Sequence, residues 1–144
     1  MIPAEEFYTH QPIAIFGVSA RSGNFGTSVY LELQKVGVRV FPINPKGGAL
    51  RHEPIFPTLR DLPEMPQAAV ILTKGDGALH AVEACAEQGV KRIWLQGGSD
   101  TPTVRQRCAD LGLNIVYGSC VLLRKGRFPH NIHRFFYNLF SRKD

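Results

Sequence analysis

Short apolar runs alternate along the chain with longer segments in which apolar residues recur at every third or fourth position. Apolar runs of this kind predict buried strands, and the longer period predicts amphipathic helices. The strands expected from the pattern are residues 13–16, 38–43, 68–73, 92–96 and 114–117. The helices expected are residues 27–36, 77–88, 99–112 and 131–140. Such regular alternation of the two kinds of element predicts a mainly parallel α/β sheet.

The alternation fills the chain without an obvious linker, so residues 1–144 are expected to form a single domain. Connections between parallel strands are right-handed, which makes a Rossmann-like, doubly wound sheet of five strands in the order 3-2-1-4-5, with helices on both faces, the simplest arrangement. In that order the chain reverses direction between the first and fourth strands. Ligands of open α/β sheets bind at the carboxyl ends of the strands near such a reversal, so the loops at that edge are the candidate site.

The loop after the first expected strand reads GVSARSGNFG, residues 17–26. A glycine-rich turn from a strand into a helix groups backbone N–H donors and the positive end of the helix around one small space, which suits a phosphate. The loop adds side-chain donors from Ser19, Arg21, Ser22 and Asn24. Its glycine spacing matches neither G-x-G-x-x-G nor G-x-x-x-x-G-K-[ST], so nucleotide hydrolysis is disfavoured. The alternative interpretation is that the glycines only shape the turn.

The loop after the second expected strand separates classes of nucleotide. Domains that bind NAD commonly place an acidic residue there, which accepts hydrogen bonds from the adenosine ribose. This chain has Asn44-Pro45-Lys46 instead. A lysine favours a ribose that already carries a phosphate, as in NADP or coenzyme A.

Five short motifs follow one another along the chain: GVS with Gly26, then FPINP, LRDLP, RIWLQGG and YGSC. On these motifs the chain resembles the small, stand-alone CoA-binding domain proteins of bacteria, from about residue 11 to residue 139. It is also similar to the CoA-binding domain of the succinyl-CoA synthetase alpha subunit, in which a Lys-Gly-Gly follows the second strand, as Lys46-Gly47-Gly48 does here. The resemblance implies a Rossmann-like fold and coenzyme A as the ligand.

Carried over residue by residue, the resemblance implies a binding site along four loops. The ligand's phosphates would lie along Gly17, Val18, Ser19, Arg21, Ser22 and Gly26. The adenosine end would meet Asn44, Pro45 and Lys46, with Lys46 near the 3′-phosphate. Thr73 and Lys74 would flank the adenine or the diphosphate, and Gln96 and Gly97 would face the pantetheine. Many members carry an acidic residue and an arginine where this chain has Ile71-Leu72-Thr73-Lys74.

No pairing of a nucleophile with an acid or base stands out in the sequence. The expected function is therefore a non-catalytic module that binds coenzyme A or an acyl-CoA, or presents it to another protein. The alternative is an NADP-type dinucleotide-binding protein or oxidoreductase. Cys85, Cys108 and Cys120 are far apart in the sequence and are interpreted as core residues, as is Trp94.

The formal net charge is +5, and the segment after position 123 contains six Arg or Lys residues but only one acidic residue, Asp144. This basic segment suggests an acidic protein partner or extra attraction for a phosphorylated ligand, and the lack of a DNA-binding motif disfavours nucleic acid. His130 and His133 have a spacing that can share a metal, but no carboxylate or thiol nearby completes a set, so a surface or capping role is preferred.

No stretch approaches the roughly 20 consecutive apolar residues of a membrane span. The chain also begins with Glu5 and Glu6 close to Met1 rather than with a basic and then apolar leader. These features predict a soluble, cytoplasmic protein without a membrane segment.

Overall fold

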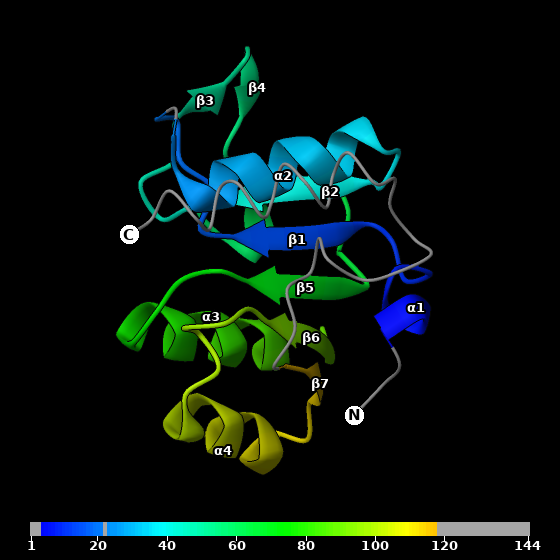
Figure 1. Ribbon diagram of the computed structural model, residues 1–144, viewed down its shortest axis with the longest axis vertical. Coiled ribbons are helices and arrows are strands. Elements are labelled where there is room, and N and C mark those ends of the chain that lie inside the picture. Colours follow the sequence, from blue (N-terminus) through cyan, green and yellow to red (C-terminus); the bar gives the residue numbers. More distant parts are fainter. Residues whose placement is uncertain (1–3, 22, 118–144) are drawn as a thin grey trace.

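The computed structural model describes residues 4–21 and 23–117, which form a five-stranded parallel sheet flanked by helices (Figure 1). The strands of this sheet are β1 (Ile13–Phe16), β2 (Val40–Ile43), β5 (Ala68–Ile71), β6 (Arg92–Leu95) and β7 (Asn114–Val116). The helices are α1 (Ala4–Phe7), α2 (Phe25–Lys35), α3 (Asp76–Glu87) and α4 (Pro102–Asp110). Between β2 and β5 lie a hairpin of β3 (Ala49–Leu50) and β4 (Glu53–Pro54), and the 3₁₀ turn η1 (Leu59–Asp61). The predicted α/β, Rossmann-like class is confirmed, whereas the predicted helix at 131–140 lies outside the described residues.

The predicted strand order 3-2-1-4-5 is wrong, because the observed order is β2-β1-β5-β6-β7. The third predicted strand, β5, pairs directly with β1, with Ile13 opposite Ala68 and Phe16 opposite Ile71. β2 lies at the edge instead. Pro42 in the middle of β2 has no N–H to donate, and proline is confined to edge strands for this reason. The chain therefore reverses direction between β1 and β5, not between the first and fourth strands.

Successive side chains of β1 point to opposite faces of the sheet and divide the core into two layers. On one face Ile15 packs with Leu33 of α2. On the other face Phe16 belongs to a buried cluster that includes Val82 of α3 and Val104 of α4. All of these side chains are buried. Helices thus cover both faces, as the sequence predicts, and α2 is separated by the sheet from α3 and α4.

The short helix α1 was not predicted from the sequence, and it lies at the amino end of β1 (Figure 1). Phe7 packs edge-to-face on Trp94 of β6 and Tyr8 packs against it at a tilt, with ring centroids 5.3 and 5.8 Å from the Trp94 ring. Trp94 is fully buried, which confirms its predicted place in the core.

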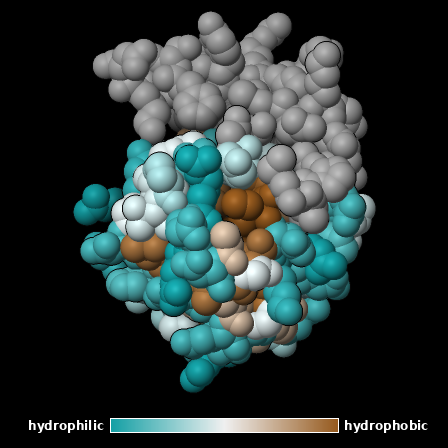
Figure 2. Space-filling model, turned by 90° about the horizontal axis from the view of Figure 1, so that it is seen from below, coloured by the Kyte–Doolittle hydropathy of each residue, from teal (hydrophilic) through white to brown (hydrophobic). Residues whose placement is uncertain are grey.

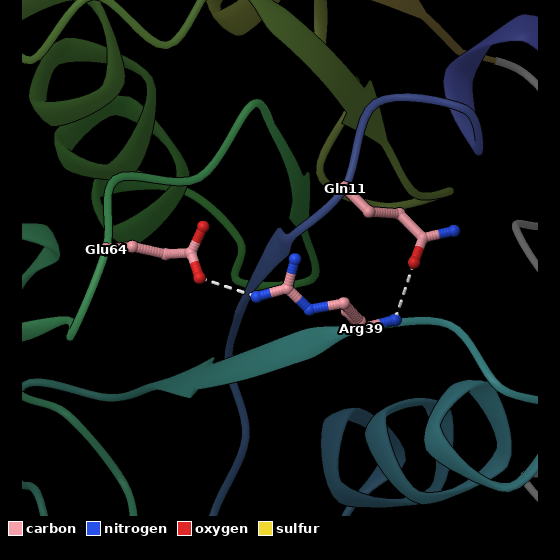
Figure 3. A network of polar contacts seen from close by, with 3 residues as sticks. All are labelled: Gln11, Arg39 and Glu64. Atoms are coloured by element: carbon pink, nitrogen blue, oxygen red, sulfur yellow. Dashed lines mark hydrogen bonds and ion pairs between the residues drawn. The ribbon is translucent and has the colours of Figure 1, made fainter.

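Polar contacts of Arg39 join the chain segments at the amino edge of the sheet (Figure 3). The backbone N–H of Arg39 donates to Gln11 Oε1 at 2.8 Å, and its guanidinium lies 2.5 Å from Glu64 Oε1. Gln11 Nε2 donates in turn to Tyr8 O at 2.9 Å. The ion pair is exposed and contributes little stability by itself. The contacts nevertheless connect the segments that precede β1, β2 and β5, at the edge opposite the predicted site.

The described surface carries few large apolar side chains. Seen from the α4 end, it is mostly hydrophilic, with hydrophobic colour limited to small areas (Figure 2). Among the described residues, Met65 and Tyr117 are the large hydrophobic side chains that are exposed. No helix within residues 4–21 and 23–117 combines the length and the apolar character needed to cross a membrane.

Candidate functional site

The loops after β1, β2, β5 and β6 all leave the carboxyl edge of the sheet, which is the edge toward which the arrows of β1 and β5 point in Figure 1. These are the loops that contain the predicted site residues. Ser22 lies outside the described residues, and the others can be placed one loop at a time.

Side chains of the β1–α2 loop satisfy much of its own backbone. Thr27 Oγ1 donates to Ser19 O at 2.6 Å and accepts from Ser19 N at 3.0 Å. Asn24 caps α2, with its Oδ1 accepting from Thr27 N at 3.0 Å. Arg21 N donates to Ser19 Oγ at 3.1 Å, and Gly17 N donates to the last residue of β2 at 3.0 Å. Four amides are thus bonded within the protein, so the loop offers fewer unpaired amides than its sequence suggests.

Gly26 is required by the close approach of α2 to β1. A Cβ atom at this position would lie 2.0 Å from Gly17 O and 2.6 Å from the Gly17 carbonyl carbon. Such a contact is far inside van der Waals distance, so no other residue fits. The helix backbone thus approaches the sheet closely at Gly26, and the space beside this residue is filled by the backbone of Gly17 and is not left open for a ligand.

The loop after β2 is joined to the loop after β1. Asn44 Nδ2 donates to Val18 O at 2.9 Å, while Asn44 Oδ1 accepts from Lys46 N at 3.0 Å. A Cβ atom at Gly48 would lie 3.6 Å from Ala20 Cβ, which shows that the two loops touch again further on. Val18 is fully buried and so contributes its backbone rather than its side chain to this edge. Asn44 therefore fixes the backbone that carries the exposed Lys46 beside the first loop.

The loops after β5 and β6 form a second connected pair. Ser99 Oγ donates to Thr73 O. The side chain of Lys74 crosses to the β6 loop, where its Cε lies 2.9 Å from the position a Cβ of Gly98 would take. Gln96 is buried and its N–H donates to the last residue of β5 at 3.2 Å. Gly97 is exposed, with no described heavy atom within 4 Å of the position of a Cβ.

A pocket of about 210 Å³ opens at the carboxyl ends of β1, β2 and β5, on the side of the sheet that α3 covers. Its wall is mainly apolar and consists of Phe16, Gly17, Ile43, Pro45, Pro57, Thr58, Leu59, Thr73, Gly77, His80, Ala81 and Ala84. Gly17, Pro45 and Thr73 are predicted site residues. Sequence reasoning missed the remainder, which come from the strand ends, from residues 57–59 at the start of η1 and from α3. The prolines of the connection before η1, at positions 54 and 57, do not by themselves predict that it folds back over the strand ends.

Charged and sulfur-containing side chains differ sharply in exposure. Arg21, Lys46 and Lys74 of the edge loops are exposed cations. Burial raises the pKa of the Cys108 thiol to about 11. Burial, with a smaller effect of the neighbouring Cys108, also raises the pKa of the Cys85 thiol. Both thiols remain protonated at neutral pH, which fits the predicted core role.

Two predictions about sulfur and metal fall partly outside the described residues. Cys120, His130 and His133 lie beyond residue 117. Within residues 4–21 and 23–117, no three His, Cys, Asp or Glu side chains are grouped so that they could hold a metal ion.

Comparison with known sequences identifies relatives. Residues 11–125 match the family described as CoA binding domain. The alpha subunit of acetate–CoA ligase [ADP-forming] I from Pyrococcus furiosus is 26% identical over 95 residues, which are 62% of this chain and 21% of that protein. Acetate–CoA ligase [ADP-forming] I from Archaeoglobus fulgidus is 25% identical over 87 residues, which are 60% of this chain and 13% of that protein. The matched region is thus a small part of these curated relatives.

Comparison with solved structures shows the same fold in other proteins. A hypothetical protein from Pyrococcus horikoshii superposes with a TM-score of 0.74 at 22% identity, over 95% of this chain and 89% of that one. The dinucleotide-forming acetyl-coenzyme A synthetase 1 of Ca. Korarchaeum cryptofilum, in complex with phosphate and ADP, gives a TM-score of 0.66 at 21% identity. That match covers 84% of this chain and 28% of the synthetase chain.

Proposed function

Because this chain belongs to the CoA-binding domain family, we propose that it binds coenzyme A or an acyl-CoA at the carboxyl edge of its sheet. The observation that carries the proposal is the joining of the β1 and β2 loops. Through Asn44, the cation Lys46 is held beside the turn that leads into α2. A phosphorylated ribose and a diphosphate would be bound by these two neighbouring groups.

The diphosphate of the ligand would lie over the β1–α2 loop. The first turn of a helix carries a partial positive charge, and α2 is long enough, at 11 residues, to present it. Several loop amides are bonded within the protein, so side chains have to supply more of the attraction than the sequence suggests. Arg21 and Lys46, both exposed at this corner, are the cations placed to do so.

The adenine ring would occupy the apolar pocket between the strand ends and α3. Pockets that hold a whole drug-sized ligand have volumes of about 300–1,000 Å³. The 210 Å³ available here suits a single ring system of a larger ligand. Pro45 lines this pocket directly before Lys46, so a ring inside it and a phosphate on the attached ribose would be contacted by adjacent residues. The pantetheine arm would leave past Gly97, where the backbone is open.

The proposed role is that of a module without chemistry of its own, which holds coenzyme A or an acyl-CoA for use by another protein. The described thiols support it, since burial keeps Cys85 and Cys108 protonated and neither supplies a nucleophile. The curated relatives carry the matched region as a fraction of a longer ligase. We propose, by analogy, that a partner supplies the reaction.

The second candidate is an NADP-type dinucleotide-binding protein. NADP shares the adenine, the diphosphate and the phosphorylated ribose with coenzyme A, so the same pocket, loop and lysine would serve it. The two ligands differ beyond the diphosphate, where a nicotinamide needs its own pocket and pantetheine needs only a narrow path.

Isothermal titration of the purified chain with CoA, dephospho-CoA, NADP and NAD separates these functions. The proposal predicts that CoA binds most tightly, that dephospho-CoA binds more weakly because it lacks the phosphate that Lys46 would contact, and that NAD binds least. Tighter binding of NADP than of CoA would favour the second candidate. If neither CoA nor NADP binds, the proposed site is rejected.

A further inference from the structure

Thr73 carries a hydroxyl group whose bonding is incomplete. This residue follows β5 at the carboxyl edge, and its Oγ1 is buried without a hydrogen-bond partner among the described residues. Its backbone oxygen, in contrast, is bonded to the Ser99 hydroxyl. Burial of a hydroxyl without a partner is unfavourable, because its hydrogen bonds to water are lost and none replaces them. Such a group requires an explanation, and a missing ligand is one that the position of Thr73 supports.

The side chain of Thr73 lies between two glycines that both line the apolar pocket. Its methyl group is 3.4 Å from the position that a Cβ of Gly17 would take. Its hydroxyl is 3.7 Å from the corresponding position at Gly77, in the first turn of α3. Because both neighbours are glycines, no Cβ atom at position 17 or 77 obstructs a change of the Thr73 rotamer. One staggered step about the Cα–Cβ bond places the hydroxyl where the methyl group now lies.

The other two polar side chains that line the pocket are either already hydrogen-bonded or at its rim. The Thr58 hydroxyl already donates to Asp61 Oδ2 at 2.9 Å. His80 is an exposed side chain on α3 and stands at the rim. The inner wall is otherwise formed by apolar residues such as Ile43 and Ala81. Thr73 is therefore the described inner-wall side chain that has both an unused donor and an unused acceptor.

We propose that Thr73 is a specificity-determining residue, whose hydroxyl turns into the pocket and hydrogen-bonds to the polar edge of a purine ring bound there. This inference rests on the proposed function for the identity of the ligand, since adenine is the ring that coenzyme A would place in the pocket. A flat ring with nitrogen donors and acceptors on its edge suits a mainly apolar wall in which the Thr73 hydroxyl is unused. The ring satisfies the Thr73 hydroxyl when it binds, which favours a purine over a purely apolar group of the same size.

The test compares Thr73→Val, which keeps the shape and removes the hydroxyl, with Thr73→Ser, which keeps the hydroxyl. Each variant and the wild type are titrated with CoA, with ADP and with 4′-phosphopantetheine, which lacks the adenosine. Thr73→Val is expected to weaken CoA and ADP by about three- to tenfold, as for one lost hydrogen bond, and to leave 4′-phosphopantetheine unchanged. Thr73→Ser is expected to bind nearly as the wild type does. The ligand-free Thr73→Val protein should melt at the same or a higher temperature, because an unsatisfied group has been removed.

A second pair of variants tests whether the ring enters this pocket. Ala84 of α3 lines the pocket, whereas Ala86, equally half-buried on the same helix, does not. Ala84→Leu should fill the pocket and abolish ADP binding, and Ala86→Leu should leave it intact. Melting temperatures of the two variants show whether either loses its fold.

The outcomes separate this inference from the proposed function. Equal CoA affinity for wild type and Thr73→Val, or equal ADP affinity for Ala84→Leu and Ala86→Leu, would overturn the role of Thr73 while CoA binding stands. Binding of ADP that depends on Thr73, without measurable binding of CoA, would overturn the proposed function and support the pocket. Absence of binding by both ligands would overturn both.

Discussion

Lys46 is the single residue that most directly connects the structure to a phosphorylated ligand. It is exposed, and Asn44 fixes its backbone next to the β1 loop. Replacement by alanine should weaken CoA by about tenfold, or about 1.4 kcal/mol, toward the lower end for a charge-assisted hydrogen bond because water screens an exposed cation. The same replacement should hardly change the affinity for dephospho-CoA.

The matched control for Lys46 is Lys35→Ala, an exposed lysine in the last turn of α2. The wild type and both variants are each titrated with CoA and with dephospho-CoA, so that the loss of affinity can be compared between the two ligands. If Lys46→Ala weakens CoA and dephospho-CoA equally, Lys46 does not contact the 3′-phosphate.

Replacement of Gly26, in contrast to that of Lys46, should affect the stability of the fold. Because Gly17 O would lie 2.0 Å from a new Cβ, Gly26→Ala must separate α2 from β1. We expect a loss of unfolding free energy of about 2 kcal/mol or more, measured by urea denaturation. Gly97→Ala is the control, since the added methyl group meets no described atom, and its stability should match that of the wild type. A stable Gly26→Ala protein would show that the junction between strand and helix is less tightly packed than described.

At the scale of elements, a buried tyrosine anchors the β3–β4 hairpin to α2. Tyr30 OH donates to Glu53 Oε1 at 3.2 Å, and Gln34 Nε2 donates to Tyr30 OH and to Glu53 Oε1, at 3.4 Å each. Burial, and secondarily the Glu53 carboxylate, raise the pKa of Tyr30 to about 12. The unfolded chain has the ordinary tyrosine pKa of about 10. The stabilising contribution is therefore complete below about pH 10 and is lost as the pH rises from about 10 to about 12.

This sign predicts a difference between wild type and Tyr30→Phe. Between pH 8 and pH 11, the free energy of unfolding in urea should fall less for Tyr30→Phe than for the wild type. Cys85 and Cys108 also have raised pKa values and titrate in the alkaline range, so only the difference between the two proteins reports on Tyr30. An identical decline in both proteins would contradict the assigned pKa.

The elements were also the scale at which sequence reasoning worked best. Apolar runs located all five strands of the sheet, and the helix predicted at residues 27–36 corresponds to α2 (Phe25–Lys35), which Gly37 follows with a φ of 92°. The hydrogen bonds inside the β1 loop could not be predicted, because the pairing of Thr27 with Ser19 depends on the folded turn. The apolar pocket was missed for a similar reason, since Pro57 and Leu59 reach the ends of the strands only through the irregular connection.

At the scale of the whole molecule, the strand order was the main error, although a signal for it was present. Pro42 disqualifies β2 from a place between two strands, and the wholly buried runs of β1 and β5 are typical of central parallel strands. The correct order moves the reversal of the chain to the position between β1 and β5. The pocket opens at the carboxyl ends of these strands and of β2, where the topology favours a ligand.

A crystal structure of this chain with bound CoA tests the central claim most directly. We expect the diphosphate over the turn formed by residues 17–26, the adenine in the pocket beside Pro45 and Thr73, and the 3′-phosphate within reach of Lys46. A complex in which CoA occupies another surface, with the β1–α2 turn and the pocket both empty, would contradict the account.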